Sequence, residues 1–252
     1  MSIQIDLSSD VAVVTGGGSG IGEGIAHLLA EAGARVAVAD LSAEAAKSVA
    51  EQITAKGGTA IGVQVDIADE ASVRQGLDAV REQLGPVSVL VNNAAAWAIK
   101  KFADTSAEDA RRVVDVTLLG TINMMRAALP DLVATQGRLV NVASDSARVG
   151  EHSMSVYAGA KAGVVAVTKS LAQEVGRKGV RANVVAPGTT VTPGSSGFIE
   201  QVGGADKLAR AYPLGRLGAP ADIAGAVLFL VSPLSTWVTG QVLSVSGGFT
   251  ML

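Results

Sequence analysis

Three side chains have types and spacing that suit the transfer of a proton to or from an oxygen atom. Tyr157 and Lys161 stand four positions apart in a segment with helical spacing, so they share one face of a helix. Ser144 ends an apolar run, and the following loop can bring its hydroxyl beside them. A phenol with a pKa of about 10 is poorly matched to neutral pH, whereas an adjacent ammonium group would lower that pKa. The trio therefore suits proton transfer to the alkoxide formed when a carbonyl is reduced, although Tyr-x-x-x-Lys alone is also typical of a surface helix.

A glycine-rich turn lies near the start of the chain. Residues 15–22 read T-G-G-G-S-G-I-G, directly after the apolar run 11–14 and directly before a segment with helical spacing. A pyrophosphate must touch the backbone and the N–H groups of the helix start, which is why glycine is needed there. No Gly-Lys-Ser/Thr follows, so the segment is not a Walker-type loop. The pattern indicates dinucleotide binding, and the alternative is an ordinary strand-to-helix turn.

An acidic residue ends the second predicted strand. Asp40 stands 18 positions after Gly22, where a dinucleotide-binding fold places a carboxylate against the adenosine ribose hydroxyls. That carboxylate repels a 2′-phosphate, and neither Leu41 nor Gly17 is basic, so the sequence favours NAD(H) over NADP(H). The alternative is a strand-end Asp that caps the next helix. Asp66 ends the next predicted strand and could accept from the adenine amino group or cap the helix after Asp69.

The elements that must position these residues alternate along the chain. Apolar, β-branched runs predict strands at 11–15, 35–40, 60–66, 87–92, 137–144, 180–186 and 241–245. Helical spacing predicts helices at 21–31, 43–56, 70–84, 107–134, 155–177 and 220–230. Ser42 and Asp69 are placed to cap helix starts, and Gly33 and Gly57 to follow helix ends. Such alternation predicts a doubly wound α/β fold, with a parallel sheet of seven strands between two layers of helices.

Composition narrows the class of protein. The 252 residues carry a formal charge of −3, are 48% hydrophobic and contain no cysteine. We expect one domain, no nucleic-acid partner, no disulfide and no metal site. Residues 1–10 have no signal-peptide pattern, and the apolar run 223–231 is too short to span a bilayer, so we expect a cytoplasmic protein without a membrane partner. Residues 187–214 are irregular and rich in glycine and proline, as in a lid over a site.

Taken together, these motifs resemble the short-chain dehydrogenase/reductase family in its single-domain form. The resemblance covers essentially the whole chain and also includes N-N-A-A at Asn92, Y-A-G-A-K at Tyr157, P-G-T-T-V-T at Pro187 and S-G-G-F-T at Ser246. It implies an NAD-dependent enzyme with a Rossmann fold and a homotetrameric assembly through the helices at 107–134 and 155–177. It also implies that Asn92 stabilises the central strand.

The resemblance also assigns roles to particular residues. Tyr157 would be the general acid/base, Lys161 would lower its pKa and hold the nicotinamide ribose, and Ser144 would orient the substrate carbonyl. Thr192 would bind the nicotinamide carboxamide. The residues expected to contact the cofactor are Gly16, Ser19, Gly20, Ile21, Gly22, Asp40, Leu41, Asp66, Ile67, Asn93, Ala94, Tyr157, Lys161, Pro187, Gly188, Thr190 and Thr192.

Two positions depart from the family pattern. Thr117 stands where the family usually has an asparagine, whose backbone carbonyl helps to hold a water molecule in the proton relay to the lysine. We expect Thr117 to bend its helix and leave that carbonyl free, so that an altered relay is retained and Thr117 counts among the catalytic residues. Ala95 replaces a more usual glycine and would narrow the space beside the nicotinamide.

The substrate is less well indicated than the reaction. Candidate substrate contacts are Ser144, Asp145, Arg148, His152 and Trp97. The stretches around Val142, Pro213 and Gly240 resemble dehydrogenases of alicyclic hydroxyacyl-CoA thioesters, and another cyclic or hydrophobic secondary alcohol is also open. Reductases of 3-oxoacyl thioesters carried by acyl carrier protein share the scaffold. A catalytically silent dinucleotide sensor or scaffold is the hypothesis from another class.

Overall fold

The computed structural model describes residues 5–251 and contains one seven-stranded sheet. All pairings are parallel, in the order β3-β2-β1-β4-β5-β6-β7. This confirms the predicted doubly wound Rossmann fold. The strands are β1 (Val11–Thr15), β2 (Arg35–Asp40), β3 (Thr59–Gln64), β4 (Val89–Asn92), β5 (Arg138–Val142), β6 (Arg181–Pro187) and β7 (Val242–Val245).

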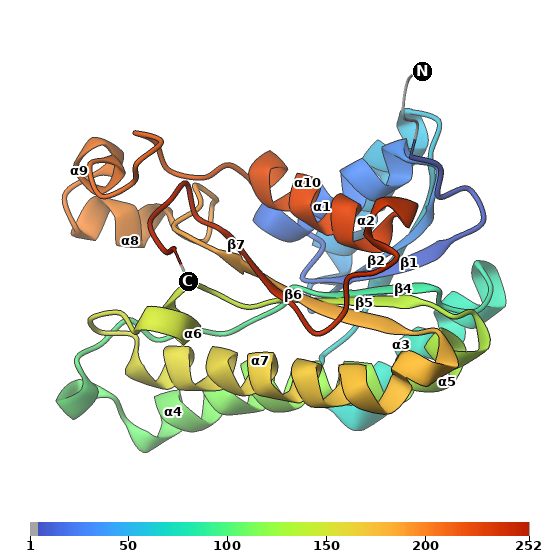
Figure 1. Ribbon diagram of the computed structural model, residues 1–252, viewed down its shortest axis with the longest axis horizontal. Coiled ribbons are helices and arrows are strands. Elements are labelled where there is room, and N and C mark those ends of the chain that lie inside the picture. The colour runs from blue at the N-terminus through green and yellow to red at the C-terminus, as the bar shows by residue number, and fades with distance from the viewer. Residues whose placement is uncertain (1–4, 252) are drawn as a thin grey trace.

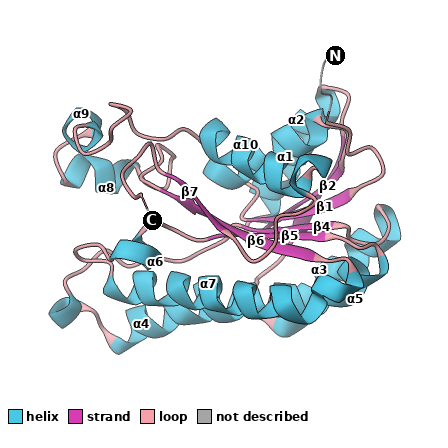
Figure 2. Ribbon diagram, in the orientation of Figure 1, coloured by secondary structure: helices cyan, strands magenta, loops and turns pink. Residues whose placement is uncertain are grey.

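Helices cover both faces of the sheet, as Figures 1 and 2 show. One layer holds α1 (Gly20–Glu31), α2 (Ala43–Ala55) and α10 (Pro220–Val231). The other holds α3 (Glu70–Gln83), α4 (Ala107–Val114), α5 (Thr121–Ala134) and α7 (Ser155–Val175). Each layer buries its own apolar cluster against the strands, and Ile25 and Leu139 are fully buried examples. No helix among the described residues is long and apolar enough to cross a membrane.

Four predicted elements differ from the structure. The predicted helix at 107–134 is interrupted by a π-helical segment, Asp115–Gly120, between α4 and α5. The expected irregular segment 187–214 instead contains two short helices, α8 (Ser196–Gln201) and α9 (Ala205–Ala209). The predicted strands 60–66 and 137–144 also extend too far toward the carboxyl end, because β3 ends at Gln64 and β5 ends at Val142. Asp66 and Ser144 therefore lie on loops beyond their strands.

The predicted helix caps are present. The side chains of Ser42 and Asp69 accept hydrogen bonds from the backbone N–H groups of Ala45 and Ala71. Gly33 and Gly57, which follow α1 and α2, have φ angles of 98° and 87°. An L side chain rarely adopts these angles, so glycine is needed to end both helices.

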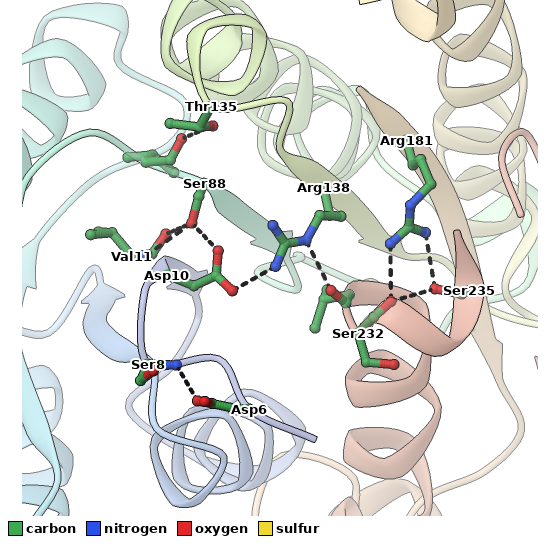
Figure 3. Close-up of polar contacts among 12 residues, drawn as sticks. Asp6, Ser8, Asp10, Val11, Ser88, Thr135, Arg138, Arg181, Ser232 and Ser235 are labelled. Carbon is green, nitrogen blue, oxygen red and sulfur yellow. Dashed lines mark hydrogen bonds and ion pairs between the residues drawn. The ribbon is translucent and has the colours of Figure 1, made fainter. Parts of the chain in front are cut away.

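A buried polar network ties the amino-terminal edge of the sheet together (Figure 3). Asp10 receives a hydrogen bond from the Ser88 hydroxyl at 2.7 Å and an ion pair from Arg138 at 2.6 Å. Arg138 also donates to the carbonyl of Val231 at the end of α10. This edge lies opposite the carboxyl ends of the strands, so the network stabilises the fold without entering the site described next.

Candidate active site

A cleft of about 430 Å³ opens at the carboxyl ends of the parallel strands. The strand order reverses between β1 and β4 at this edge, which is where open α/β sheets bind their ligands. The residues that the sequence predicted and that the structure places in the lining are Gly16, Ser19, Gly20, Ile21, Asp40, Leu41, Asp66, Ile67, Asn93, Ala94, Trp97, Ser144, Asp145, Tyr157, Lys161, Pro187, Gly188, Thr190 and Thr192. Gly22, Thr117, Arg148 and His152 are not part of that lining.

The glycine turn has the close backbone approach that a pyrophosphate needs. Gly16 and Gly20 have φ angles of 61° and 58°, which favour glycine. A Cβ atom on Gly22 would lie 2.0 Å from the Gly16 carbonyl oxygen, so Gly22 permits the packing of α1 against the turn without lining the cleft. The side chain of Thr192 lies beside Gly20, since a Cβ atom on Gly20 would lie 3.2 Å from it. Ser19, Gly20 and Ile21 at the start of α1 line the cleft, and the N–H groups of a first helical turn favour an anion.

Asp40 has both a local structural role and a place in the lining. Its Oδ2 accepts from the N–H of Gly18 at 2.9 Å, and its Oδ1 accepts from the N–H of Ser42 at 3.0 Å. These bonds hold the carboxylate against the glycine turn at the end of β2. Asp66 also lines the cleft and accepts from the N–H of Ala68 at 2.9 Å. Neither carboxylate caps a helix, because the N-caps of α2 and α3 are Ser42 and Asp69, so the capping alternative is wrong for both residues. The contact of each carboxylate with a cofactor stays a prediction.

The N-N-A-A segment joins the glycine turn to the centre of the sheet. Asn92 donates to Asn141 Oδ1 on the neighbouring strand at 2.8 Å, which confirms the predicted stabilisation of β4. Asn93 donates to the carbonyls of Thr15 and Gly16 at 3.0 and 3.1 Å. Asn93 thus fixes the shape of the glycine turn and lines the cleft at the same time.

The three predicted catalytic side chains meet at one place in the cleft. Tyr157 and Lys161 both lie on α7, and the ammonium of Lys161 is 5.8 Å from the centre of the Tyr157 ring. Ser144 follows β5, and its hydroxyl shares a hydrogen bond with Tyr157. Ser146 orients that hydroxyl by donating to it from its N–H at 3.1 Å and from its own Oγ at 2.8 Å.

Burial has the largest effect on the pKa values of Tyr157 and Lys161. Burial lowers the pKa of Lys161 to about 7, and its ammonium donates to the Val142 carbonyl at 2.5 Å. The pKa of Tyr157 is raised, first by burial and then by the negative charge of Glu151, while the hydrogen bond with Ser144 acts in the opposite direction. The expectation that Lys161 lowers the pKa of Tyr157 is therefore not confirmed, since that pKa is raised. Desolvation of the phenolate outweighs a lysine that is itself desolvated.

Thr117 lies in the π-helical segment and is fully buried. Its hydroxyl donates to the Ala96 carbonyl at 2.8 Å and accepts from the Ala96 N–H at 3.1 Å. The carbonyl of Thr117 accepts from the Thr121 hydroxyl at 2.8 Å. The expectation that this carbonyl is left free is thus wrong, because the Thr121 hydroxyl already donates to it, while the helix is interrupted at Thr117 by the π-helical segment. The hydroxyl of Thr117 bonds the loop after β4 instead of its own helix.

Beyond Tyr157, away from the glycine turn, the cleft is lined by apolar side chains and by two carboxylates. Trp97 packs edge-on against Tyr157 with ring centres 6.2 Å apart, and the other apolar lining side chains there are Ile99, Met154 and Phe198. Asp145 and Glu151 also line the cleft, and burial together with Asp145 raises the pKa of Glu151. His152 is exposed, with Nδ1 2.8 Å from the Ser153 hydroxyl. Arg148 lies on α6 (Ser146–Val149).

Several residues of the site carry no recognisable sequence signal. Ser195 supports Thr192: its hydroxyl accepts from the Thr192 N–H at 2.9 Å and donates to the Thr190 carbonyl at 2.7 Å. Ser244 donates to Asp145 Oδ1 at 2.6 Å across the sheet from β7. Such pairs join positions far apart in the chain or lie in loops without periodicity. For Glu151, the sequence offers one indication of a place in the site, which is its position between Ser144 and Tyr157.

Comparison with known proteins agrees with this geometry. Residues 16–250 match the family model described as enoyl-(acyl carrier protein) reductase. An oxidoreductase of Methylorubrum extorquens is 40% identical over 96% of this chain and 98% of its own length. The chain belongs to the short-chain dehydrogenase/reductase family. It is therefore an oxidoreductase that acts on CH–OH groups and binds a nicotinamide dinucleotide.

Two further members of the short-chain dehydrogenase/reductase family show how closely the scaffold is kept. The 3-oxoacyl-(acyl-carrier-protein) reductase of Aquifex aeolicus is 36% identical and covers 98% of this chain and 99% of its own length. An NADPH-bound short-chain oxidoreductase of Pseudomonas aeruginosa, described as having an atypical catalytic centre, superposes with a TM-score of 0.93. It is 36% identical, over 98% of this chain and 99% of that one.

Proposed function

We propose that this protein interconverts a secondary alcohol and a ketone with NAD(H), and that Tyr157 is the general acid/base. The observation that carries the proposal is that Ser144, Tyr157 and Lys161 meet in the same cleft as the glycine turn and Asp40. When bound, the dinucleotide supplies the hydride acceptor or donor and, in its oxidised form, a positive charge. Ser144, held by Ser146, is placed to orient the substrate oxygen, and Tyr157 exchanges a proton with that oxygen.

The residues of the cleft fit a nicotinamide dinucleotide. The glycine turn presents backbone N–H groups to a pyrophosphate, and Asp40 faces the position of the adenosine ribose. Thr192, held by Ser195, reaches toward the other end of the turn at Gly20. Lys161, with a pKa lowered to about 7, is placed to donate to ribose hydroxyls and to exchange the proton that reaches Tyr157.

NAD(H) is favoured over NADP(H) by the charges at the adenosine end. Asp40 and Asp66 are the charged side chains there, and Lys161 is the one basic side chain in the lining among residues 5–251. A 2′-phosphate beside Asp40 would meet like charge without a cation. The NADPH-bound relative from Pseudomonas aeruginosa makes this choice a point to test.

For the substrate, the apolar end of the cleft supports a cyclic or hydrophobic secondary alcohol, with alicyclic hydroxyacyl thioesters among the candidates. Trp97, Ile99, Met154 and Phe198 form apolar walls beside Tyr157. The matches to 3-oxoacyl thioester reductases keep that substrate class as the second candidate. The burial of Tyr157 and Lys161 argues against a silent sensor, because a scaffold has no need to desolvate both a lysine and a phenol.

The exposed apolar side chains support assembly into a homotetramer. Leu119 on the π-helical segment is 46% exposed, and Trp237 after α10 is 99% exposed. Leu119 also lies within the stretch 107–134, through which the family resemblance implies assembly.

The test is steady-state reduction and oxidation by the purified protein with each cofactor, against cyclic ketones, aryl ketones, sugars and oxoacyl thioesters. We expect turnover of cyclic or hydrophobic substrates, with kcat/KM for NADH above that for NADPH. Asp40→Asn keeps an acceptor for the Gly18 N–H and removes only the charge, so it should narrow the NADH preference by about tenfold or more. An unchanged preference in that variant would refute the role of Asp40, and binding of NADH without turnover of any substrate would support the sensor.

A further inference from the structure

The wall of the cleft beyond Tyr157 carries two carboxylates that the catalytic trio does not use. Glu151 lies in the turn before α7, is partly buried and lines the cleft with Ser144 and Tyr157. Asp145 is 2% exposed, and only its Oδ1 has a hydrogen-bond donor, the Ser244 hydroxyl at 2.6 Å. Within residues 5–251, its Oδ2 has no hydrogen-bond partner. The two carboxylates lie close enough for Asp145 to raise the pKa of Glu151.

No cation in the described lining compensates this charge. Lys161 is the one basic side chain among the described lining residues, and its ammonium donates to the backbone carbonyl of Val142. It is also almost completely buried, with 2% of its surface exposed. The negative charge of Glu151 reaches Tyr157, whose pKa it helps to raise. A group held near the Tyr157 hydroxyl therefore also experiences the field of Glu151.

The rest of that wall gives a substrate little else to bond. Trp97, Ile99, Met154 and Phe198 offer apolar surface beside the carboxylates. In such surroundings a carboxylate interacts strongly with charge, and a hydrogen-bond donor on the substrate would offset the cost of burying it. An anionic substituent would instead be placed against like charge, and Lys161 is the one basic side chain in the described lining.

We propose that Glu151 determines substrate specificity, by accepting a hydrogen bond from a donor group on the carbon next to the carbinol. The cleft then prefers secondary alcohols with an adjacent ammonium or hydroxyl group and rejects those with an adjacent carboxylate. This inference rests on the proposed function for its catalytic readout. It adds a property that the proposed function does not contain, which is selection by charge at the substituent.

Three cyclohexanols that differ only in one ring substituent provide the test. The protein with NAD⁺ is given trans-2-aminocyclohexanol, trans-1,2-cyclohexanediol and trans-2-hydroxycyclohexanecarboxylate, and kcat/KM is measured for each. We expect the amine and the diol to be oxidised more efficiently than the carboxylate. Glu151→Gln should reduce the amine-to-carboxylate ratio about tenfold or more, because it removes the charge and keeps the shape.

Two matched variants separate charge from general damage. Glu151→Asp keeps the carboxylate and should keep the order of the three alcohols. Glu82→Gln removes a carboxylate from an exposed position of α3 outside the cleft and should leave all three ratios unchanged. An amine-to-carboxylate ratio that is the same in wild type and Glu151→Gln would overturn the proposal.

Calorimetric titration of the same alcohols into the NAD⁺-loaded protein keeps the two hypotheses distinguishable. If none of the alcohols is oxidised, the proposed function fails for this class, while a charge preference in binding that Glu151→Gln abolishes still supports the role of Glu151. Equal affinity for amine and carboxylate, or binding of neither, would overturn it.

Discussion

The hydroxyl of Thr117 bonds both backbone groups of Ala96, donating to the carbonyl at 2.8 Å and accepting from the N–H at 3.1 Å. The two residues come from different elements, the π-helical segment and the loop after β4. This loop carries Ala94 and Ala95 along the cleft. Thr117 therefore positions the wall of the cleft from behind, without lining it.

Replacing Thr117 with valine should destabilise the protein and reduce its activity. Thr117→Val keeps the shape of the side chain but leaves the N–H and carbonyl of Ala96 without this partner, at a cost of about 1–3 kcal/mol. Movement of residues 94–96 should also lower kcat/KM about tenfold or more. Urea unfolding and steady-state kinetics measure both effects. Thr117→Ser retains the hydroxyl and should restore most of the activity; equal kinetics in the valine variant would exclude a positioning role.

Removal of the Tyr157 hydroxyl should nearly abolish turnover while cofactor binding persists. Tyr157→Phe keeps the ring packed against Trp97 but removes the group that exchanges a proton, so kcat should fall by about 10²–10⁴-fold. Cofactor fluorescence titration should give an affinity close to that of wild type. The other tyrosine, Tyr212, accepts from the Thr189 N–H at 2.9 Å, so Tyr212→Phe should change KM while the pH profile of kcat stays the same. Equal turnover by Tyr157→Phe would remove the acid/base assignment.

The strand and helix order could be read from the sequence because burial on a parallel sheet imposes it. Continuous apolar runs such as Val36 to Val38 and the caps at Ser42 and Asp69 are local signals. The π-helical segment at Thr117 could not be read in this way, because its local spacing is that of an ordinary helix. Within that segment Thr117 bonds Ala96, 21 positions away in the chain, and local spacing does not encode such a contact.

The same distinction applies to the site. Glycine turn, strand-end acid and Tyr-x-x-x-Lys are local patterns, so the sequence could place Gly16, Asp40 and Tyr157 in one cleft. The pKa of Tyr157 depends instead on how far α7 and the turn at Glu151 exclude water, which no spacing encodes. The Tyr-x-x-x-Lys spacing likewise does not encode the burial of Lys161, of which only 2% is exposed.

Stability should rise with pH in the window where Lys161 titrates differently in the folded and unfolded chain. Its folded pKa is about 7, below the ordinary value of 10.5, so the unfolded chain binds more protons between those values and unfolding becomes costlier as pH increases. Lys161→Met removes this contribution. Between pH 7.5 and 9.5 the free energy of unfolding of wild type should therefore rise relative to the variant by roughly 2 kcal/mol, at about 1.4 kcal/mol per pH unit.

Two features of the chain keep that measurement interpretable. Tyr157, with a raised pKa, adds a slope of opposite sign only above the ordinary tyrosine pKa of 10.0, outside the window. Lys169 lies on the same helix and is exposed, so Lys169→Met should leave the pH dependence as in wild type. Parallel curves for wild type and Lys161→Met would mean that the ammonium keeps its charge in the folded protein.

The ion pair between Asp10 and Arg138 should matter for stability and not for catalysis. Asp10 is 6% exposed and joins Arg138 and Ser88 at the edge of the sheet opposite the cleft (Figure 3). Asp10→Ala leaves a largely buried guanidinium without its carboxylate, which should cost about 3–5 kcal/mol of the free energy of unfolding. Urea unfolding should show a lower midpoint at constant m value, while kcat/KM of the folded enzyme is unchanged. Adding Arg138→Met to Asp10→Ala should recover part of the loss, because no unpaired charge then remains buried; a double variant as unstable as the sum of the single ones would show that the two residues do not interact.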